Sequence, residues 1–170
     1  MKKPFSTQQT PSNISAILEI LRDTPARLES LSEELPAEQL RKPLGMGERS
    51  LIETLAHLLN SEARSSEAIY LALLVDEPLL VGVHSERDFG KLLRYDQFEL
   101  SELLDYFKFR RTALLRVLVS LTEAQWSRSV REEGKQRKES VYWRARAMAM
   151  HESEHLATLE KKLGGKEAAP

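Results

Sequence analysis

Apolar residues recur at spacings of three and four in four long segments of this chain, and this repeat constrains the fold more than any other feature. The segments cover residues 12–35, 50–75, 100–121 and 139–163. Such spacing places the apolar side chains on one face of an α-helix, which is then buried against other helices. The strand signal is weak, because "LLVGV" is the only cluster rich in β-branched residues and it is short. The sequence therefore predicts an all-α four-helix bundle.

The breaks between these segments differ in kind. Pro25 interrupts the first segment and should kink the helix or begin a second piece, with Thr24 as a candidate cap. The connection over residues 36–49 has room for a short helical turn, and residues 131–140 are typical of a charged turn. Residues 76–99 are numerous enough to cross the end of a bundle, so the helix order need not be up-down-up-down.

The composition excludes several classes of protein and of site. The length suits a single domain, residues 1–170, whose ends 1–12 and 164–170 we expect to be frayed. The 25 basic and 26 acidic residues nearly balance, which argues against a nucleic-acid partner. No segment resembles a signal peptide or a membrane span, so we expect a cytoplasmic protein without a membrane partner. With no cysteine present, nitrogen and oxygen atoms must hold any metal, and any thiol must come from outside.

The segment "HESEH" in the last predicted helix carries the strongest chemical signal. On a helical wheel His155 lies within the apolar stripe and His151 at its edge, while Glu152 lies near its centre and Glu154 points away. Buried imidazoles and carboxylates need partners. Because imidazoles four residues apart on a helix reach the same point, a metal ion is the partner that this spacing favours.

Two further histidines are candidates for a third ligand. His84 lies in an irregular connection and is interpreted as a surface loop residue. His57 lies in the middle of the second predicted helix, almost opposite its leucine stripe, on a face of small residues. Such a face fits either a pocket wall or a solvent-exposed position, and periodicity alone leaves His57 undecided between them.

The "HESEH" segment also matches two zinc-peptidase patterns, H-E-x-x-H and H-x-x-E-H. Each pattern needs a third ligand, which in the H-E-x-x-H families usually lies downstream of the second histidine. Only 15 residues follow His155, and the position of a downstream third histidine is occupied by Lys161. The context therefore disfavours a zinc metallopeptidase.

Two charged residues fall on apolar faces of other predicted helices. Glu62 lies among leucines on the second helix, and Arg111 lies among apolar residues on the third. A buried ion pair that joins the two helices is the favoured interpretation. The alternative is a substrate-binding role, in which Arg111 receives a substrate carboxylate in the bundle.

Several motifs together resemble the DinB-like superfamily, which includes the YfiT-type metalloenzymes. The resembling segments are "TPARLESL" (24–31), "SLIETLAHLLNSE" (50–62) and "AMHESEHLATLEKKL" (149–163). The pattern is a serine that opens the second helix, a histidine seven residues on, a glutamate five after that, and a terminal H-x-x-x-H-L. These places are filled by Ser50, His57, Glu62, His151, His155 and Leu156. Arg49 departs from the pattern, because the family often has tryptophan there.

The resemblance implies a bundle with up-down-down-up order and a metal held by His57, His151 and His155. It implies a divalent ion, with zinc or nickel favoured, and an enzyme of the thiol-transferase or hydrolase kind. The substrate would be a small molecule, and the family's low-molecular-weight thiols are candidates. Glu152 would act as a catalytic base or orient a ligand, unless it pairs with an arginine. The alternatives are a non-catalytic metal-binding bundle and a metal-free interaction bundle, and a homodimer fits the sequence without being required by it.

Overall fold

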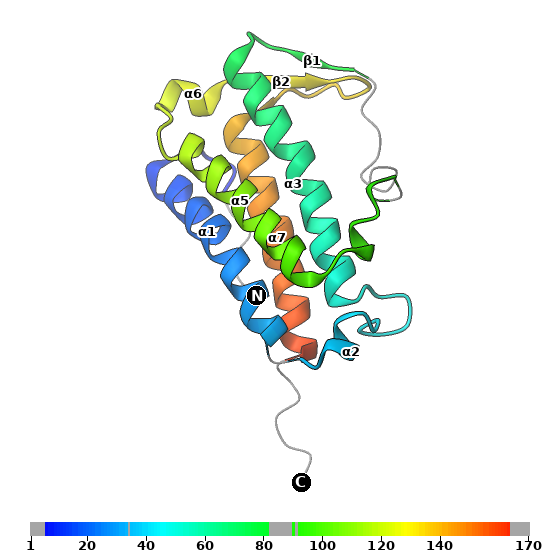
Figure 1. Ribbon diagram of the computed structural model, residues 1–170. Coiled ribbons are helices and arrows are strands. Elements are labelled where there is room, and N and C mark those ends of the chain that lie inside the picture. The colour runs from blue at the N-terminus through cyan, green and yellow to red at the C-terminus, as the bar shows by residue number, and fades with distance from the viewer. Residues whose placement is uncertain (1–5, 34, 82–89, 91, 164–170) are drawn as a thin grey trace.

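A computed structural model describes residues 6–33, 35–81, 90 and 92–163 of the chain. Four long helices, α1 (Pro11–Glu33), α3 (Leu51–Leu74), α5 (Leu100–Leu118) and α7 (Val141–Leu163), pack together along most of their length (Figure 1). The four-helix bundle predicted from the apolar repeat is confirmed.

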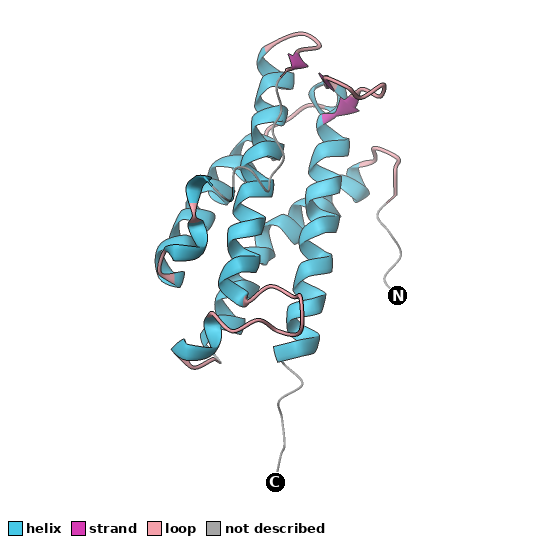
Figure 2. Cartoon of the chain, turned by 90° about the vertical axis from the view of Figure 1, so that its right-hand side faces the viewer, coloured by secondary structure: helices cyan, strands magenta, loops and turns pink. Residues whose placement is uncertain are grey.

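The order of the helices is up-down-down-up, as the family resemblance implied. In Figure 1, α1 and α7 run downward whereas α3 and α5 run upward. The neighbours of α1 are α5 and α7, and those of α3 are also α5 and α7. Figure 2 shows α3 and α7 side by side as antiparallel helices. Since α3 and α5 are parallel, the connection between them must return along the bundle, which explains its length.

Local hydrogen bonds fix where helix α3 begins. The Ser50 hydroxyl accepts a hydrogen bond from the backbone N–H of Glu53 at 3.2 Å, and the Glu53 carboxylate accepts one from the backbone N–H of Ser50 at 2.7 Å. This reciprocal pair satisfies two backbone donors that a helix start leaves free. The predicted start of this helix at Ser50 is therefore correct to one residue.

Of the two outcomes expected at Pro25, a kink or a second helical piece, the second piece is wrong, because α1 continues through Pro25 as one helix. Proline has no N–H, so the carbonyl of Leu21, four residues earlier, lacks its usual helical donor. The guanidinium of Arg111 supplies the missing donor from α5, with Nη1 at 2.5 Å from the Leu21 oxygen. Thr24 is not a cap either: its hydroxyl donates to the Ile20 carbonyl at 2.9 Å inside the helix.

Short elements cover one end of the bundle. Three strands, β1 (Leu79–Leu80), β2 (Ser129–Glu132) and β3 (Glu139–Ser140), are arranged in the order β1-β2-β3. Strand β2 is parallel to β1 and antiparallel to β3. The segment predicted as a charged turn thus connects two strands of a small hairpin. Strands of two to four residues are too short to show a clear alternating pattern in a sequence, so periodicity could not reveal them.

Short helices also lie in the described parts of the connections. The helical turn for which residues 36–49 had room is α2 (Ala37–Leu40), and η1 (Tyr95–Gln97) precedes α5. A third, α6 (Glu123–Ser127), follows α5. Within the part of the chain that the structure describes, no helix combines the length and the apolar character needed to cross a bilayer.

The N-terminal segment is attached to the bundle, contrary to the fraying expected for all of residues 1–12. The hydroxyl of Tyr142 and Nε of Arg146 both donate to the Ser6 carbonyl, at 2.8 and 2.9 Å. The side-chain amide of Gln9 donates to the Glu123 carbonyl at 3.0 Å. Residues 1–5, residues 164–170 and His84 lie outside the described part of the chain.

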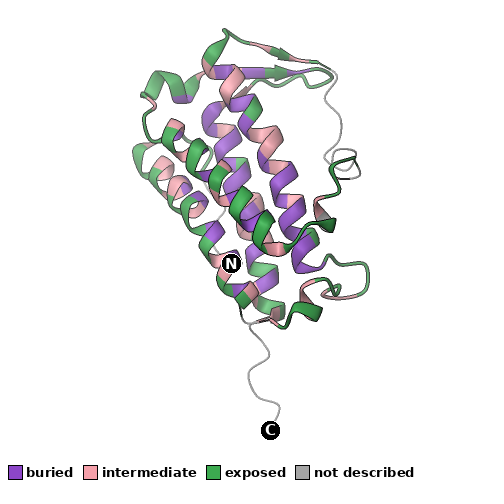
Figure 3. Cartoon of the chain, viewed as in Figure 1, coloured by how far each residue is buried: buried purple, intermediate pink, exposed green. Residues whose placement is uncertain are grey.

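The core consists of two apolar clusters on either side of a buried charged layer. Figure 3 shows the buried residues on the inward faces of the long helices. The cluster near the strands includes Ile17 and Leu114, and the cluster at the opposite end includes Leu55 and Phe107. Between them lies the charged layer, which is formed by Glu62, Arg111 and Glu152.

Candidate metal centre

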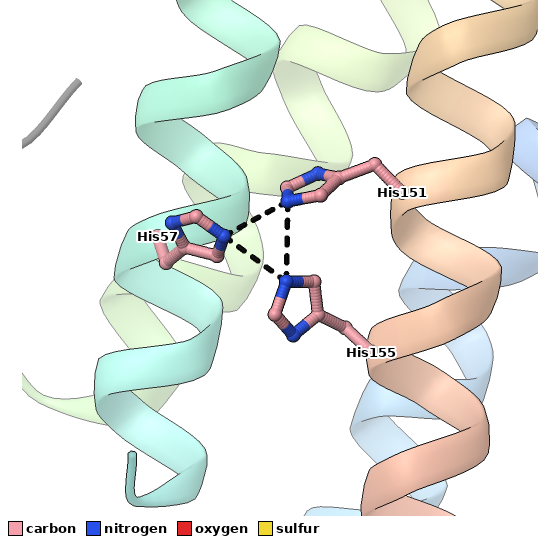
Figure 4. Close-up of side chains that lie close together, drawn as sticks. All are labelled: His57, His151 and His155. Carbon is pink, nitrogen blue, oxygen red and sulfur yellow. Dashed lines mark hydrogen bonds between the residues drawn. The ribbon is translucent and has the colours of Figure 1, made fainter. Parts of the chain in front are cut away.

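Three histidine rings from two helices converge in the groove between α3 and α7 (Figure 4). Nε2 of His57 lies 2.9 Å from Nε2 of His151 and 3.0 Å from Nε2 of His155. The Nε2 atoms of His151 and His155 are 3.1 Å apart. All three residues are half-buried, so the cluster is screened by the helices yet reachable from solvent.

The helix positions explain this convergence. His151 and His155 are separated by one turn and therefore lie on the same face of α7. His57 lies on the side of α3 opposite its leucine stripe, and that side packs against α7. Its neighbours Thr54 and Ala68 are buried, so α3 is covered on both sides. The small residues around His57, which left its position undecided, allow this close approach.

The protons of the three rings cannot satisfy all three close nitrogen contacts. A neutral imidazole nitrogen is either a donor or an acceptor. With three nitrogens and two roles, at least one of the three pairs must place two N–H groups or two lone pairs against each other. A cation removes the conflict, because each of the three nitrogens can direct a lone pair toward it.

The donor set fits a divalent metal ion. Imidazole nitrogens lie about 2.0–2.1 Å from zinc, and imidazole also suits nickel and iron. Nitrogens separated by 2.9–3.1 Å are close enough for one ion at that distance to reach all of them. Three protein ligands leave further coordination positions for water or substrate, as in catalytic rather than structural zinc sites.

Ser61, one turn after His57 on α3, lies behind one of the rings. Its hydroxyl oxygen is 3.4 Å from Nδ1 of His151. If Nε2 of His151 carries the lone pair that faces the centre, Nδ1 carries the proton and donates it to Ser61. Partners of this kind fix the tautomer and the orientation of metal-binding histidines. Sequence analysis did not identify Ser61, although its position one turn from His57 on the same face was a usable signal.

Glu152, predicted as a catalytic base, lies with Arg111 and not among the ligand atoms. Its side chain is 1% exposed, and its two oxygens accept hydrogen bonds from Arg111 Nη1 at 3.0 Å and Nη2 at 2.6 Å. This is the arginine pairing that the sequence left open as the alternative. The catalytic role of Glu152 stays a prediction. Glu154 is exposed, as its place on the helical wheel indicates.

Arg111, which lies on α5, bonds to each of the other three long helices in the middle of the core. Besides Glu152 on α7 and the Leu21 carbonyl on α1, its Nη2 donates to the Glu62 carboxylate at 2.8 Å and its Nε at 3.2 Å. The ion pair favoured from the sequence is thus present, with a second carboxylate added. Substrate-binding roles for Arg111 and Glu62 stay predictions, and in this arrangement both side chains are occupied by each other.

Burial and charge oppose each other in this layer. Burial lowers the pKa of Arg111, but the neighbouring charges of Glu152 and Glu62 raise it by more, so the guanidinium stays charged. Burial raises the pKa of Glu62 above its usual value, and Arg111 offsets only part of that rise. Arg110 is a second cation at the edge of the layer: its Nε lies 3.5 Å from the Glu62 carboxylate, and its charge lowers the pKa of Glu62.

Pockets flank the histidine cluster on both sides along the groove. One, of about 500 Å³, includes His155 in its wall. The other, of about 240 Å³, includes Ser61 and Ala147, which lie one turn from His57 and His151. The sequence did not reveal these pockets, because their walls combine residues of α3 and α7 with loop or hairpin residues that are distant in sequence.

The geometry also bears on the peptidase patterns. In those patterns the glutamate between the histidines acts as general base beside the metal. Here Glu152 is turned into the core and Glu154 into solvent, and the third histidine comes from an upstream helix. The arrangement therefore disfavours the peptidase reading on structural grounds as well.

Comparisons with known proteins agree with the four-helix bundle. The chain is similar to YfiT from Bacillus subtilis, described as a probable metal-dependent hydrolase with an unusual four-helix bundle topology. The sequence identity is 18%, the TM-score is 0.82, and the match covers 94% of this chain and 92% of YfiT. No curated protein matches the chain. A family profile described as the DinB superfamily matches residues 20–159, so the chain belongs to the DinB superfamily.

Proposed function

We propose that this protein is a divalent-metal-dependent enzyme that acts on small molecules, with hydrolysis as the favoured reaction and transfer of an external thiol as the alternative. The observation that carries the proposal is the convergence of three histidine Nε2 atoms within 3.1 Å of one another. The likeness to YfiT supports hydrolysis. The lack of cysteine is compatible with a thiol supplied from outside.

The chain's own residues have distinct tasks in this proposal. His57, His151 and His155 would hold the ion as neutral ligands, so the site would keep a net positive charge that favours hydroxide or a thiolate. Zinc or nickel bound in this way would lower the pKa of a coordinated water toward neutrality. Arg111 holds the Glu152 carboxylate in the core, which keeps that negative charge away from the three ring nitrogens.

The surroundings of the cluster suit a small substrate. The pocket that includes His155 has a volume of about 500 Å³, within the range of small-molecule sites. A second copy of the chain is not needed to complete the histidine cluster, since all three ligands belong to one chain. A homodimer therefore stays a separate proposal about assembly.

Elemental analysis of untagged protein tests the proposal most directly. We expect about one zinc or nickel per chain, and loss of that metal in His57→Ala and in His151→Ala. Glu154→Gln is the matched control, because this exposed residue lies inside the same segment but points away from the cluster. It should keep the metal.

Turnover is then measured on the metal-loaded protein with activated esters and with an electrophile plus a low-molecular-weight thiol. We expect hydrolysis or thiol transfer that disappears in the histidine variants. Stoichiometric metal without turnover on either substrate class would favour a non-catalytic metal-binding protein. Protein without stoichiometric metal would refute the proposal.

A further inference from the structure

The pocket next to His155 is formed by the loop before α3 and by the last turns of α7. In Figure 2 this loop passes across the lower ends of α3 and α7. The pocket is lined by Leu44, Gly47, Glu48, Arg49, Thr54, His155, Thr158 and Leu159. A molecule in the pocket therefore touches one of the three metal-binding histidines.

The loop holds its charged residues in a defined place. The backbone N–H of Leu44 donates to the Arg49 carbonyl at 3.3 Å, and Ser50 caps α3 immediately afterwards. Gly45 allows close packing, since a Cβ there would lie 2.8 Å from a carboxylate oxygen of Glu48. Gly47 has a φ of +74°, a backbone conformation that residues other than glycine rarely adopt. The backbone that carries Arg49 is thus fixed on both sides.

The charges in the pocket do not balance. Glu48 is neutralised by Lys162, whose Nζ lies 2.6 and 2.5 Å from its two carboxylate oxygens. Arg49 is exposed, and among the described residues no carboxylate lies within ion-pair distance of it. Arg49, which contributes to the wall of the pocket, therefore carries a positive charge that no carboxylate of the described residues balances.

The other polar side chains of the wall do not compete for an anion. The hydroxyl of Thr54 donates to the Ser50 carbonyl at 2.8 Å, and that of Thr158 donates to the Glu154 carbonyl at 2.9 Å. Both hydroxyls thus use their protons on the helix backbone and offer only lone pairs to the pocket. Among the charged and hydroxyl side chains of this wall, Arg49 is therefore the one that offers N–H donors and an unbalanced positive charge to an acidic group.

We propose that this pocket is the substrate site and that Arg49 binds a carboxylate of the substrate, so that the reactive end of the molecule reaches the histidine cluster. The inference rests on the proposed metal-dependent function and adds to it the class of substrate, a small acidic molecule. The planar guanidinium suits this role because its paired N–H groups match the two oxygens of a carboxylate.

The pocket on the other side of the cluster is less suited to the same role. Its three cations, Arg64, Lys135 and Arg144, all bind Glu132, at 2.7, 3.0 and 3.0 Å. Its volume is about 240 Å³, half that of the first pocket. These cations are committed to the hairpin that covers the end of the bundle, whereas Arg49 is available.

A pair of hydroxamates that bind zinc tests the inference on the full-length, untagged, zinc-loaded protein. Succinic monohydroxamate carries a carboxylate three carbons from the metal-binding group, and butyrohydroxamate is its uncharged counterpart of similar length. By isothermal titration calorimetry we expect the acidic probe to bind about tenfold more tightly. Arg49→Gln should remove this preference and leave the affinity for butyrohydroxamate within about twofold, while Arg49→Lys should retain part of the preference.

Arg64→Gln is the matched control, since it removes a guanidinium from the other pocket, and it should keep the full preference. Equal affinity of the two probes for the wild-type protein, or a preference that survives Arg49→Gln, would overturn the inference while leaving the metal site intact. Failure of the protein to bind zinc would overturn the proposed function, and this inference with it.

Discussion

Nη1 of Arg111 lies 2.5 Å from the main-chain oxygen of Leu21 and donates a hydrogen bond to it. This oxygen is the one that Pro25 leaves without a helical donor. A proline inside a buried helix ordinarily costs about 3 kcal/mol relative to alanine. Here the lost bond is replaced by a charged donor from another helix, which explains why α1 continues unbroken.

Pro25→Ala should therefore stabilise the protein much less than proline removal from a helix usually does. The new N–H competes with Arg111 for the Leu21 carbonyl, so we expect the free energy of unfolding to change by less than about 1 kcal/mol. Urea denaturation followed by circular dichroism measures the difference. A gain near the full helix-propensity value of about 3 kcal/mol would mean that Arg111 contributes nothing at this position.

Arg111→Met should destabilise the bundle by about 3–5 kcal/mol, because it leaves Glu62 and Glu152 buried without their shared cation. Chemical denaturation of wild type and variant gives the difference. The double change Glu62→Gln with Arg111→Met should recover part of the loss. If Arg111 served mainly to bind substrate, the variant would keep its stability and lose only affinity.

Glu132 should give the protein a stability that depends on pH. Burial raises the pKa of its carboxyl, but hydrogen bonds from Arg144 and Lys135 and the charge of Arg64 lower it by more, so the net shift is downward. The folded state thus binds fewer protons than the unfolded state. The contribution is present above the ordinary pKa of 4.5 and is lost as the pH falls through the lower, folded value.

Glu132→Gln should cost about 1–3 kcal/mol at pH 7. The difference from wild type should shrink as the pH falls below 4.5, because the wild-type carboxylate is then protonated as well. Urea denaturation at a series of pH values checks both expectations. A difference that stays constant across the series would show that the charge of Glu132 is not the source of its contribution.

Ser61→Ala should weaken metal binding by about tenfold, at the low end for loss of a group that orients a histidine ligand. The contact with Nδ1 of His151 is long, at 3.4 Å, which limits the effect. Competition for zinc against a coloured chelator measures the affinity. Ser65→Ala is the control: it removes a serine hydroxyl one turn further along α3, away from the cluster, and should leave the zinc affinity unchanged.

The apolar repeat was sufficient to predict four helices and the inward position of Glu152, because these depend only on the period of the helix. It could not decide the position of His57, whose face is buried by a helix that lies almost a hundred residues away in sequence. The motif resemblance assigned His57 to the cluster, and in the structure the His57 ring lies beside those of His151 and His155. Tertiary partners decided what the periodicity could not.

The expectation of a second helical piece at Pro25 failed for the same reason. The sequence shows that the Leu21 carbonyl loses its local donor, but not that a guanidinium from α5 replaces it. Likewise, the unpaired charge of Arg49 depends on the pairing of its neighbour Glu48 with Lys162 across the pocket. Contacts between segments distant in sequence leave no periodic pattern, so these features could be found only in the folded chain.

The charged layer also fixes the relative height of the helices along the bundle. One guanidinium on α5 reaches a carboxylate on α3 and another on α7 only when those two helices are at one relative height. A shift of α7 by a single turn, about 5.4 Å, would leave Glu152 in an apolar cluster without a cation. The same relative height places His57 opposite His151 and His155. The meeting of the three rings in the groove is therefore secured from inside the core, by an arginine that touches none of them.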